Sequence, residues 1–170
     1  MNLKLTVNVE GALLKGMAPK IIQKNLDETI TRVTNLLENE VLKRTPQGVI
    51  GSKAGLIKSI KGKVIGKGTP LIKGIVFHTS VYGDVIEKGR RPGKGISMAG
   101  REALIPWINE KLGITGKQAE RVAFLISRKI KLHGFEGRHM FENALKENMS
   151  VIDDIFTKVG FDIARELGEE

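Results

Sequence analysis

The segment LIKSIKGKVIGKGTPLIKGIVFHTSVY, residues 56–82, holds the clearest strand pattern in the chain. Apolar residues interleave with lysines over 56–65, and a second alternating run covers 71–82. One face of that second run holds Ile75, Phe77, Thr79 and Val81. The glycines, threonine and proline of 66–70, between the two runs, are typical of a turn. The segment therefore predicts a β-hairpin.

The residues before this hairpin predict one more strand and one long helix. Residues 3–9 alternate at period two, which is typical of a half-buried strand. From 19 to 43 the period becomes helical. The apolar stripe of that helix consists of Ile22, Leu26, Ile30, Val33, Leu37 and Val41. We expect the helix to end at Thr45-Pro46, because a residue before proline disfavours the helical conformation.

The residues after the hairpin predict three helices, over about 101–112, 117–132 and 140–167. Strands in the first half and helices in the second predict an α+β fold. In it, a small antiparallel sheet, made of the N-terminal strand and the β-hairpin, packs against the long N-terminal helix and the C-terminal helices. We expect a single domain over 1–170, with mobile loops near 46–55 and 88–100.

The composition narrows the class of protein. The chain has 170 residues, of which 41% are hydrophobic and 28% are charged, as in globular proteins. It contains no cysteine, which excludes disulfides and thiolate metal sites. No apolar run approaches the roughly 18 residues of a membrane span. We therefore expect a soluble protein, made in the cytoplasm, with no membrane partner.

The positive charge is concentrated in the middle of the chain. The formal net charge is +9. Residues 41–101 hold thirteen basic residues and two acidic ones, whereas the rest holds fifteen basic and seventeen acidic residues. Such asymmetry bears on partners rather than on the fold.

No motif in the sequence predicts a reaction. Residues 62–69 resemble a P-loop only superficially, since three residues rather than four separate the glycines and a strand pattern follows. The histidines at 78, 133 and 139 have no ligand-like spacing. No nucleophile stands with a base and an acid. We predict that the protein is not an enzyme and that it has no catalytic residues, metal site or cofactor.

Two interpretations of the basic hairpin remain open. Lysines between apolar residues keep an exposed sheet face soluble and protect an edge strand. However, residues 41–83 contain eight basic residues and no acid, and a solvated face normally mixes both signs. Contact with the DNA backbone is the alternative. The residues that would face DNA are Lys53, Lys58, Lys61, Lys63 and Lys67.

Several segments, taken in order, resemble a bacteriophage neck and tail-completion family of long-tailed phages. Residues 45–60, from Thr45-Pro46 to GLIKSI, resemble its "APxxTGxLxxSI" passage. Residues 82–89, YGDVIEKG, resemble "YAxxVExGT", and residues 137–145, GRHMFENAL, resemble "PFLxPAL". The order and spacing agree over roughly residues 20–165.

The resemblance implies a non-enzymatic structural protein of the virion, at the junction of head and tail. Such a protein forms a homo-oligomeric ring and docks between the connector or head-completion proteins and the tail-terminator or tail-tube proteins, with double-stranded DNA passing by. The extended loops would engage neighbouring subunits. The residues expected at this subunit interface are Tyr82, Glu87, Lys88, Arg90, Arg91, Lys94 and Arg101. The alternative function is a sequence-nonspecific DNA-binding module that uses the basic hairpin.

Overall fold

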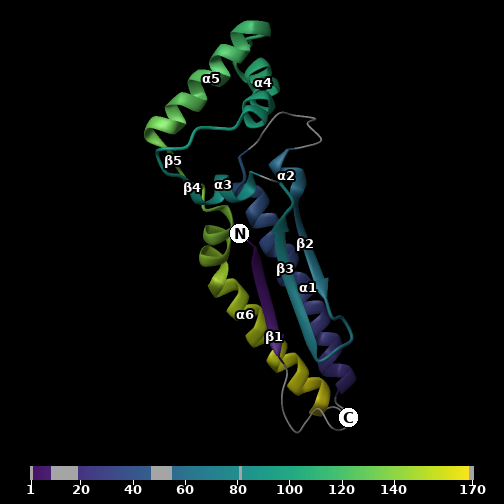
Figure 1. Cartoon of the computed structure of the whole chain (residues 1–170). Coiled ribbons are helices and arrows are strands. Elements are labelled where there is room, and N and C mark those ends of the chain that lie inside the picture. Colours follow the sequence, from purple (N-terminus) through teal and green to yellow (C-terminus); the bar gives the residue numbers. More distant parts are fainter. Residues whose placement is uncertain (1, 9–18, 47–54, 81, 169–170) are drawn as a thin grey trace. The chain divides into compact units, whose positions relative to one another are not determined.

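The computed structural model describes residues 2–8, 19–46, 55–80 and 82–168. The chain divides into two compact units (Figure 1). The first, here named the sheet unit, comprises Met1–Arg44, Ile60–His78 and Met140–Glu170. The second, the helical unit, comprises Thr45–Ser59 and Thr79–His139.

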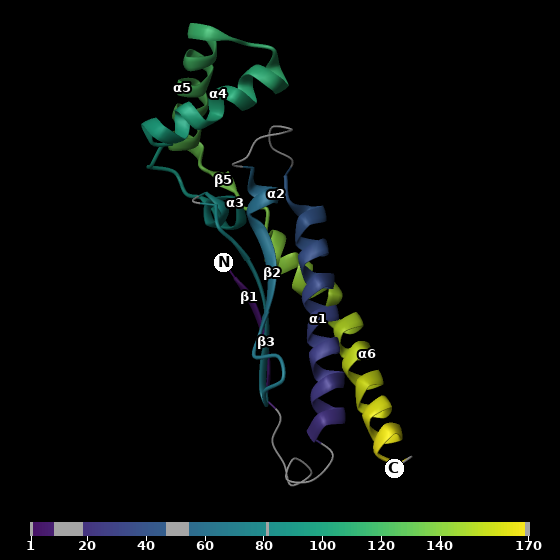
Figure 2. The ribbon, with the colours of Figure 1, turned by 90° about the vertical axis from the view of Figure 1, so that its right-hand side faces the viewer.

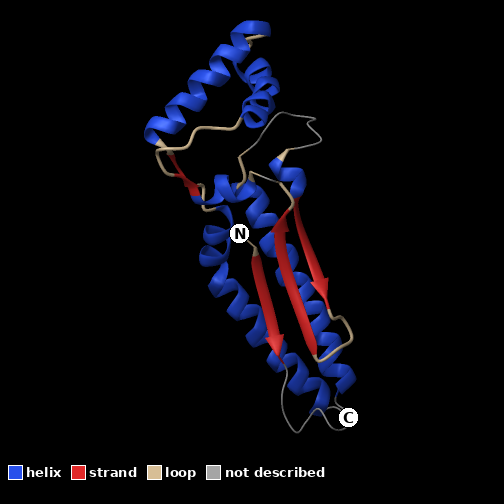
Figure 3. Cartoon of the chain, viewed as in Figure 1, coloured by secondary structure: helices blue, strands red, loops and turns tan. Residues whose placement is uncertain are grey.

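The sheet unit contains a three-stranded antiparallel sheet (Figure 3). Its strands are β1 (Leu3–Asn8), β2 (Ile60–Ile65) and β3 (Leu71–His78), in the order β1-β3-β2. β2 and β3 form the predicted hairpin, and the N-terminal strand pairs with the other edge of β3.

Two long helices cover one face of this sheet (Figure 2). They are α1 (Pro19–Arg44) and α6 (Met140–Gly168). α1 packs against β2, β3 and α6, and α6 also contacts β1. These contacts confirm the predicted α+β fold with its sheet against the N-terminal and C-terminal helices.

The contact between α1 and the sheet depends on two glycines. A Cβ atom at Gly74 would collide with the Oγ1 atom of Thr34, and one at Gly62 would lie 2.8 Å from a carboxylate oxygen of Glu38. Without side chains at these positions, the helix backbone can approach the strands closely. Leu26 and Ile30 of α1 then bury against Ile72 of β3.

Parts of the predicted hairpin are wrong in detail. Residues Leu56–Ser59 form a short helix, α2, rather than the start of a strand. On β3, Ile72, Gly74 and Val76 are buried, whereas Ile75 and Phe77 lie on the other, partly exposed face. Both faces of β3 carry large apolar residues, so alternation alone did not indicate which of them α1 covers. Val81 lies outside the described residues.

The helical unit is built around a pair of helices. α4 (Met98–Leu112) and α5 (Gly116–His133) pack together around Ile108, Ala119 and Ala123. The bounds of α1, α4, α5 and α6 lie within three residues of those predicted from the sequence. The unit also contains α3 (Gly83–Lys88) and two short paired strands, β4 (Gly89–Arg90) and β5 (Phe135–Glu136), which the sequence did not predict.

The segment between β4 and α4 is bonded to α5. The backbone N–H of Gly93 donates to the carbonyl of Lys131 at 2.8 Å. The hydroxyl of Ser127 accepts from the N–H of Ile96 at 3.0 Å and donates to its carbonyl at 3.2 Å. Part of the segment 88–100, which was predicted to be a mobile loop, therefore forms hydrogen bonds with α5 within its unit.

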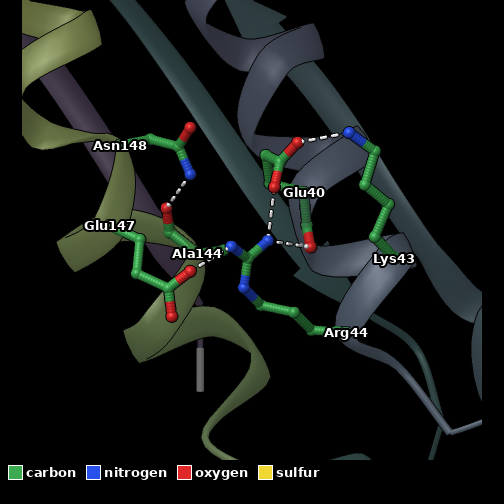
Figure 4. A network of polar contacts seen from close by, with 6 residues as sticks. All are labelled: Glu40, Lys43, Arg44, Ala144, Glu147 and Asn148. Carbon is green, nitrogen blue, oxygen red and sulfur yellow. Dashed lines mark hydrogen bonds and ion pairs between the residues drawn. The ribbon is translucent and has the colours of Figure 1, made fainter.

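An ionic network joins the end of α1 to α6 (Figure 4). The guanidinium of Arg44 donates to the carboxylate of Glu40 and to that of Glu147 on α6. Lys43 donates to the other oxygen of Glu40 at 2.6 Å. The hydrogen bonds from Arg44 and then Lys43 lower the pKa of Glu40 below its ordinary value of 4.5.

We expect the substitution Gly74→Ala to lower the free energy of unfolding by about 2 kcal/mol, because the added methyl group overpacks the contact with Thr34. Gly160→Ala, on α6 where nothing lies within 4 Å, is the control and should be neutral or stabilising. Denaturant titration measures both. The cost of Gly74→Ala should shrink in a Thr34→Ala background, and an equal cost in both backgrounds would contradict the proposed collision.

We expect Arg44→Gln to cost about 1 kcal/mol of stability at pH 7, since it removes one cation shared by two carboxylates. Because folding lowers the pKa of Glu40, its contribution is complete above pH 4.5 and is lost as the pH falls through the folded-state value. The difference between Arg44→Gln and the original protein should therefore narrow below pH 4.5. Lys43→Gln, at the most exposed partner, should cost less. A pH-independent difference would contradict this assignment.

Candidate interaction surfaces

The seven residues predicted at a subunit interface all lie in the helical unit. Tyr82 precedes α3 and is exposed, as are Lys88, Arg91 and Lys94. Arg90 lies in β4 and is half-buried. The exposed basic side chains of Lys88, Arg91 and Lys94 are therefore accessible to a neighbouring molecule.

Two of the seven have roles inside the unit. The side chain of Glu87 is only 1% exposed, so it belongs to the interior of the unit. The guanidinium of Arg101 lies over the ring of Phe124, 5.9 Å from its centroid, which is a cation–π contact.

Two passages quoted for the family resemblance meet in this unit. The N–H groups of Arg138 and His139 donate to the carbonyls of Ile86 and Glu87, at 2.8 Å and 3.0 Å. Next to them, Gly89 has a φ of 74° and lies so close to the backbone of Gly137 that a side chain would collide. Gly89 of the YGDVIEKG passage is therefore required, because its backbone crosses that of the GRHMFENAL passage at this point.

The five lysines predicted to face DNA are placed differently from one another. Lys53 lies outside the described residues. Lys58 is exposed on α2 in the helical unit. Lys61 and Lys63 project from β2, and Lys67 lies in the turn before β3, all in the sheet unit.

The structure adds two lysines to those of β2. The sheet face opposite α1, here named the open face, carries Lys4, Lys61, Lys63 and Lys73. Lys4 and Lys63 flank Ile75 from the two neighbouring strands, and Lys61 lies opposite Phe77. The described strands β1, β2 and β3 contain no acidic residue. The pairing register places these four lysines around Ile75 and Phe77. This register was not predicted from the sequence.

A groove lies between the hairpin turn and α1. It has a volume of about 1060 Å³, and its lining mixes Lys20, Lys24, Arg32 and Lys67 with Asp27 and Glu28. Asp27 accepts hydrogen bonds from the side chain of Gln23 and from the N–H of Gly68, both at 2.9 Å. Asp27 thus fixes the hairpin turn to α1, which gives this groove a structural role.

The outward side of α5 combines apolar and basic side chains. Phe124, Leu125 and Leu132 are 53%, 57% and 59% exposed. Arg121 and Arg128 are exposed beside them. Sequence reasoning missed this surface, because it counted charge by segment and used the helical period only to find the buried stripe.

Within the described ranges, no group of three or more histidine, aspartate and glutamate residues is placed to hold a metal ion. In the same part of the chain, none of the helices combines the length and apolarity that crossing a membrane requires. Comparisons with protein-family models, curated proteins and solved structures found no match to this chain.

Proposed function

We propose that this chain is a structural virion protein of the phage head–tail junction, a neck or tail-completion component that works as a homo-oligomeric ring. The observation that carries the proposal is the amount of large apolar surface that the described helices leave exposed. Eight such side chains lie on α4, α5 and α6: Met98, Leu112, Phe124, Leu125, Leu132, Met149, Val151 and Phe161.

Exposed apolar surface of this kind favours association. Phe161 alone is 72% exposed, although a fully buried phenylalanine gains about 1.5–3 kcal/mol. Single exposed apolar residues are ordinary, but several on neighbouring turns of one helix mark an interaction site. A ring in which each copy covers the next would bury this surface.

The resemblance to the neck and tail-completion family gives the proposal its location. In this chain, two of the passages that carry the resemblance meet at a backbone crossing that requires Gly89. In the proposed assembly, the ring docks between connector or head-completion proteins and tail-terminator or tail-tube proteins. It is made in the host cytoplasm, ends in the virion, and uses neither cofactor nor catalysis.

The open face supports a second function, sequence-nonspecific binding of double-stranded DNA. Four lysines without a carboxylate among them attract a polyanion, and contacts to phosphate need no base recognition. In a ring, the same face can line the path of the passing DNA. The two proposals are therefore compatible, but each is tested separately.

We expect the purified protein to form oligomers of defined size whose fraction rises with concentration. Size-exclusion chromatography with light scattering measures the mass, and negative-stain images should show closed rings. Mass spectrometry of mature virions should detect the chain. A protein that stays monomeric up to about 100 µM, roughly a hundredfold above micromolar affinity, and is absent from virions would overturn the proposal.

For the second function, we expect affinity for DNA to fall steeply with salt in a gel-shift titration. The double substitution Lys61→Glu and Lys63→Glu should lower the salt slope by about 2, since it removes two phosphate contacts. Lys146→Glu with Lys158→Glu on α6 makes the same charge change away from the sheet and is the matched control. Equal loss in both variants would show that the open face is not the binding surface.

A further inference from the structure

The outward side of α5 forms a continuous stripe. Arg121, Leu125, Arg128 and Leu132 follow one another at spacings of four, three and four residues, so they share one side of the helix. The side turned inward holds Ala119, Ala123 and Ser127, which are buried. The stripe, together with Phe124, is here named the α5 face.

The α5 face is strongly basic. α5 contains one acidic residue, Glu120, and five basic ones: Lys117, Arg121, Arg128, Lys129 and Lys131. Arginine combined with apolar side chains is a composition enriched at protein interfaces. Because the apolar side chains stand between cations, the matching surface must carry both apolar groups and carboxylates.

Another surface of the same chain has that composition. α6 contains six acidic residues and three basic ones. Its exposed side, here named the α6 face, carries Met149 and Phe161 with the carboxylates of Glu142, Glu147, Asp153 and Asp154, and also Lys146, Lys158 and Arg165. The opposite side of α6 is buried through Phe141, Ala144 and Ile152.

The two faces also match in length. From Arg121 to Leu132 the α5 face spans about 16 Å, and from Met149 to Phe161 the α6 face spans about 18 Å, at a rise of roughly 1.5 Å per residue. Each presents large apolar side chains of which about half or more is exposed. They stand beside Arg121 and Arg128 on the α5 face, and beside the adjacent carboxylates Asp153 and Asp154 on the α6 face. Charge complementarity of this kind fixes the register of a contact and disfavours wrong partners.

We propose that the α5 face of one copy binds the α6 face of the next copy. This inference rests on the proposed function, because it names the contact through which the ring closes. Two different surfaces in contact make a heterologous interface, which repeats from copy to copy and forms a ring where the rotation between copies closes. A two-fold dimer that paired α5 with α5 would instead bring arginines together, and they would repel.

Charge reversal tests the contact in both directions. One variant carries Arg121→Glu with Arg128→Glu, and the other carries Asp153→Lys with Asp154→Lys. Each alone should raise the apparent dissociation constant of the oligomer about 100-fold, because like charges then oppose one another. Equimolar mixing of the two should restore assembly, since the unchanged α5 face meets the unchanged α6 face and the reversed faces match each other. Analytical ultracentrifugation measures all three samples.

Matched controls separate the contact from net charge. Lys24→Glu with Arg32→Glu on α1 equals the first variant in charge change, and Glu102→Lys with Glu136→Lys in the helical unit equals the second. Both should assemble like the original protein. Circular dichroism and thermal unfolding verify that every variant is folded, and Leu125→Ser should weaken assembly without any change of charge.

The outcomes distinguish the two proposals. If the original protein assembles and either charge reversal leaves the oligomer intact, the proposed α5–α6 interface is wrong. The proposal that the protein forms a ring would not be affected by that result. If the mixed variants stay apart, the two faces do not contact each other between copies, and the inference fails in the same way. If the original protein never associates, both the interface and the proposed function fail.

Discussion

The close approach of α1 to the sheet determines which surfaces the sheet unit can offer. Gly74 and Gly62 leave no side chain between the strands and the helix, so Thr34 and Glu38 sit directly over the backbone. This contact places Ile72 and Val76 inside. By the period of two, it turns every lysine of β2 and β3 to the other face. The basic open face is thus a consequence of the packing of α1.

The helices were predictable because their signals are local. Thr45-Pro46 ends α1, and Gly134, with a φ of 67°, ends α5 next to His133, as their residue types indicate. The sequence did not indicate which face of β3 is buried, because both faces carry large apolar residues. Ile72 and Val76 lie on one face, and Ile75 and Phe77 on the other. Gly62 and Gly74 do lie on the face that α1 covers. The sequence alone does not show this, because it does not indicate where on these strands a helix packs.

The short strands show a different limit. β4 and β5 have two residues each, and they pair segments separated by more than forty residues. No propensity of a two-residue segment can predict such a pairing, because the stability comes from the crossing of Gly89 and Gly137. The candidate surfaces were missed for a related reason. Lys4 and Lys73 join the lysines of β2 through register, and the α5 face emerges only after the buried side of α5 is known.

The proposed association joins copies of a protein with a net charge of +9, and it depends on the segregation of charge along the chain. At physiological salt the Debye length is about 8 Å, so contact depends on the charges that meet rather than on the total. The open face carries four lysines and α5 holds five basic residues and one acidic one, whereas α6 carries twice as many acidic as basic residues. The proposed α5–α6 contact brings opposite signs together and does not use the lysines of the open face. In these two proposals, self-association and attraction to a polyanion therefore use different side chains of one small chain.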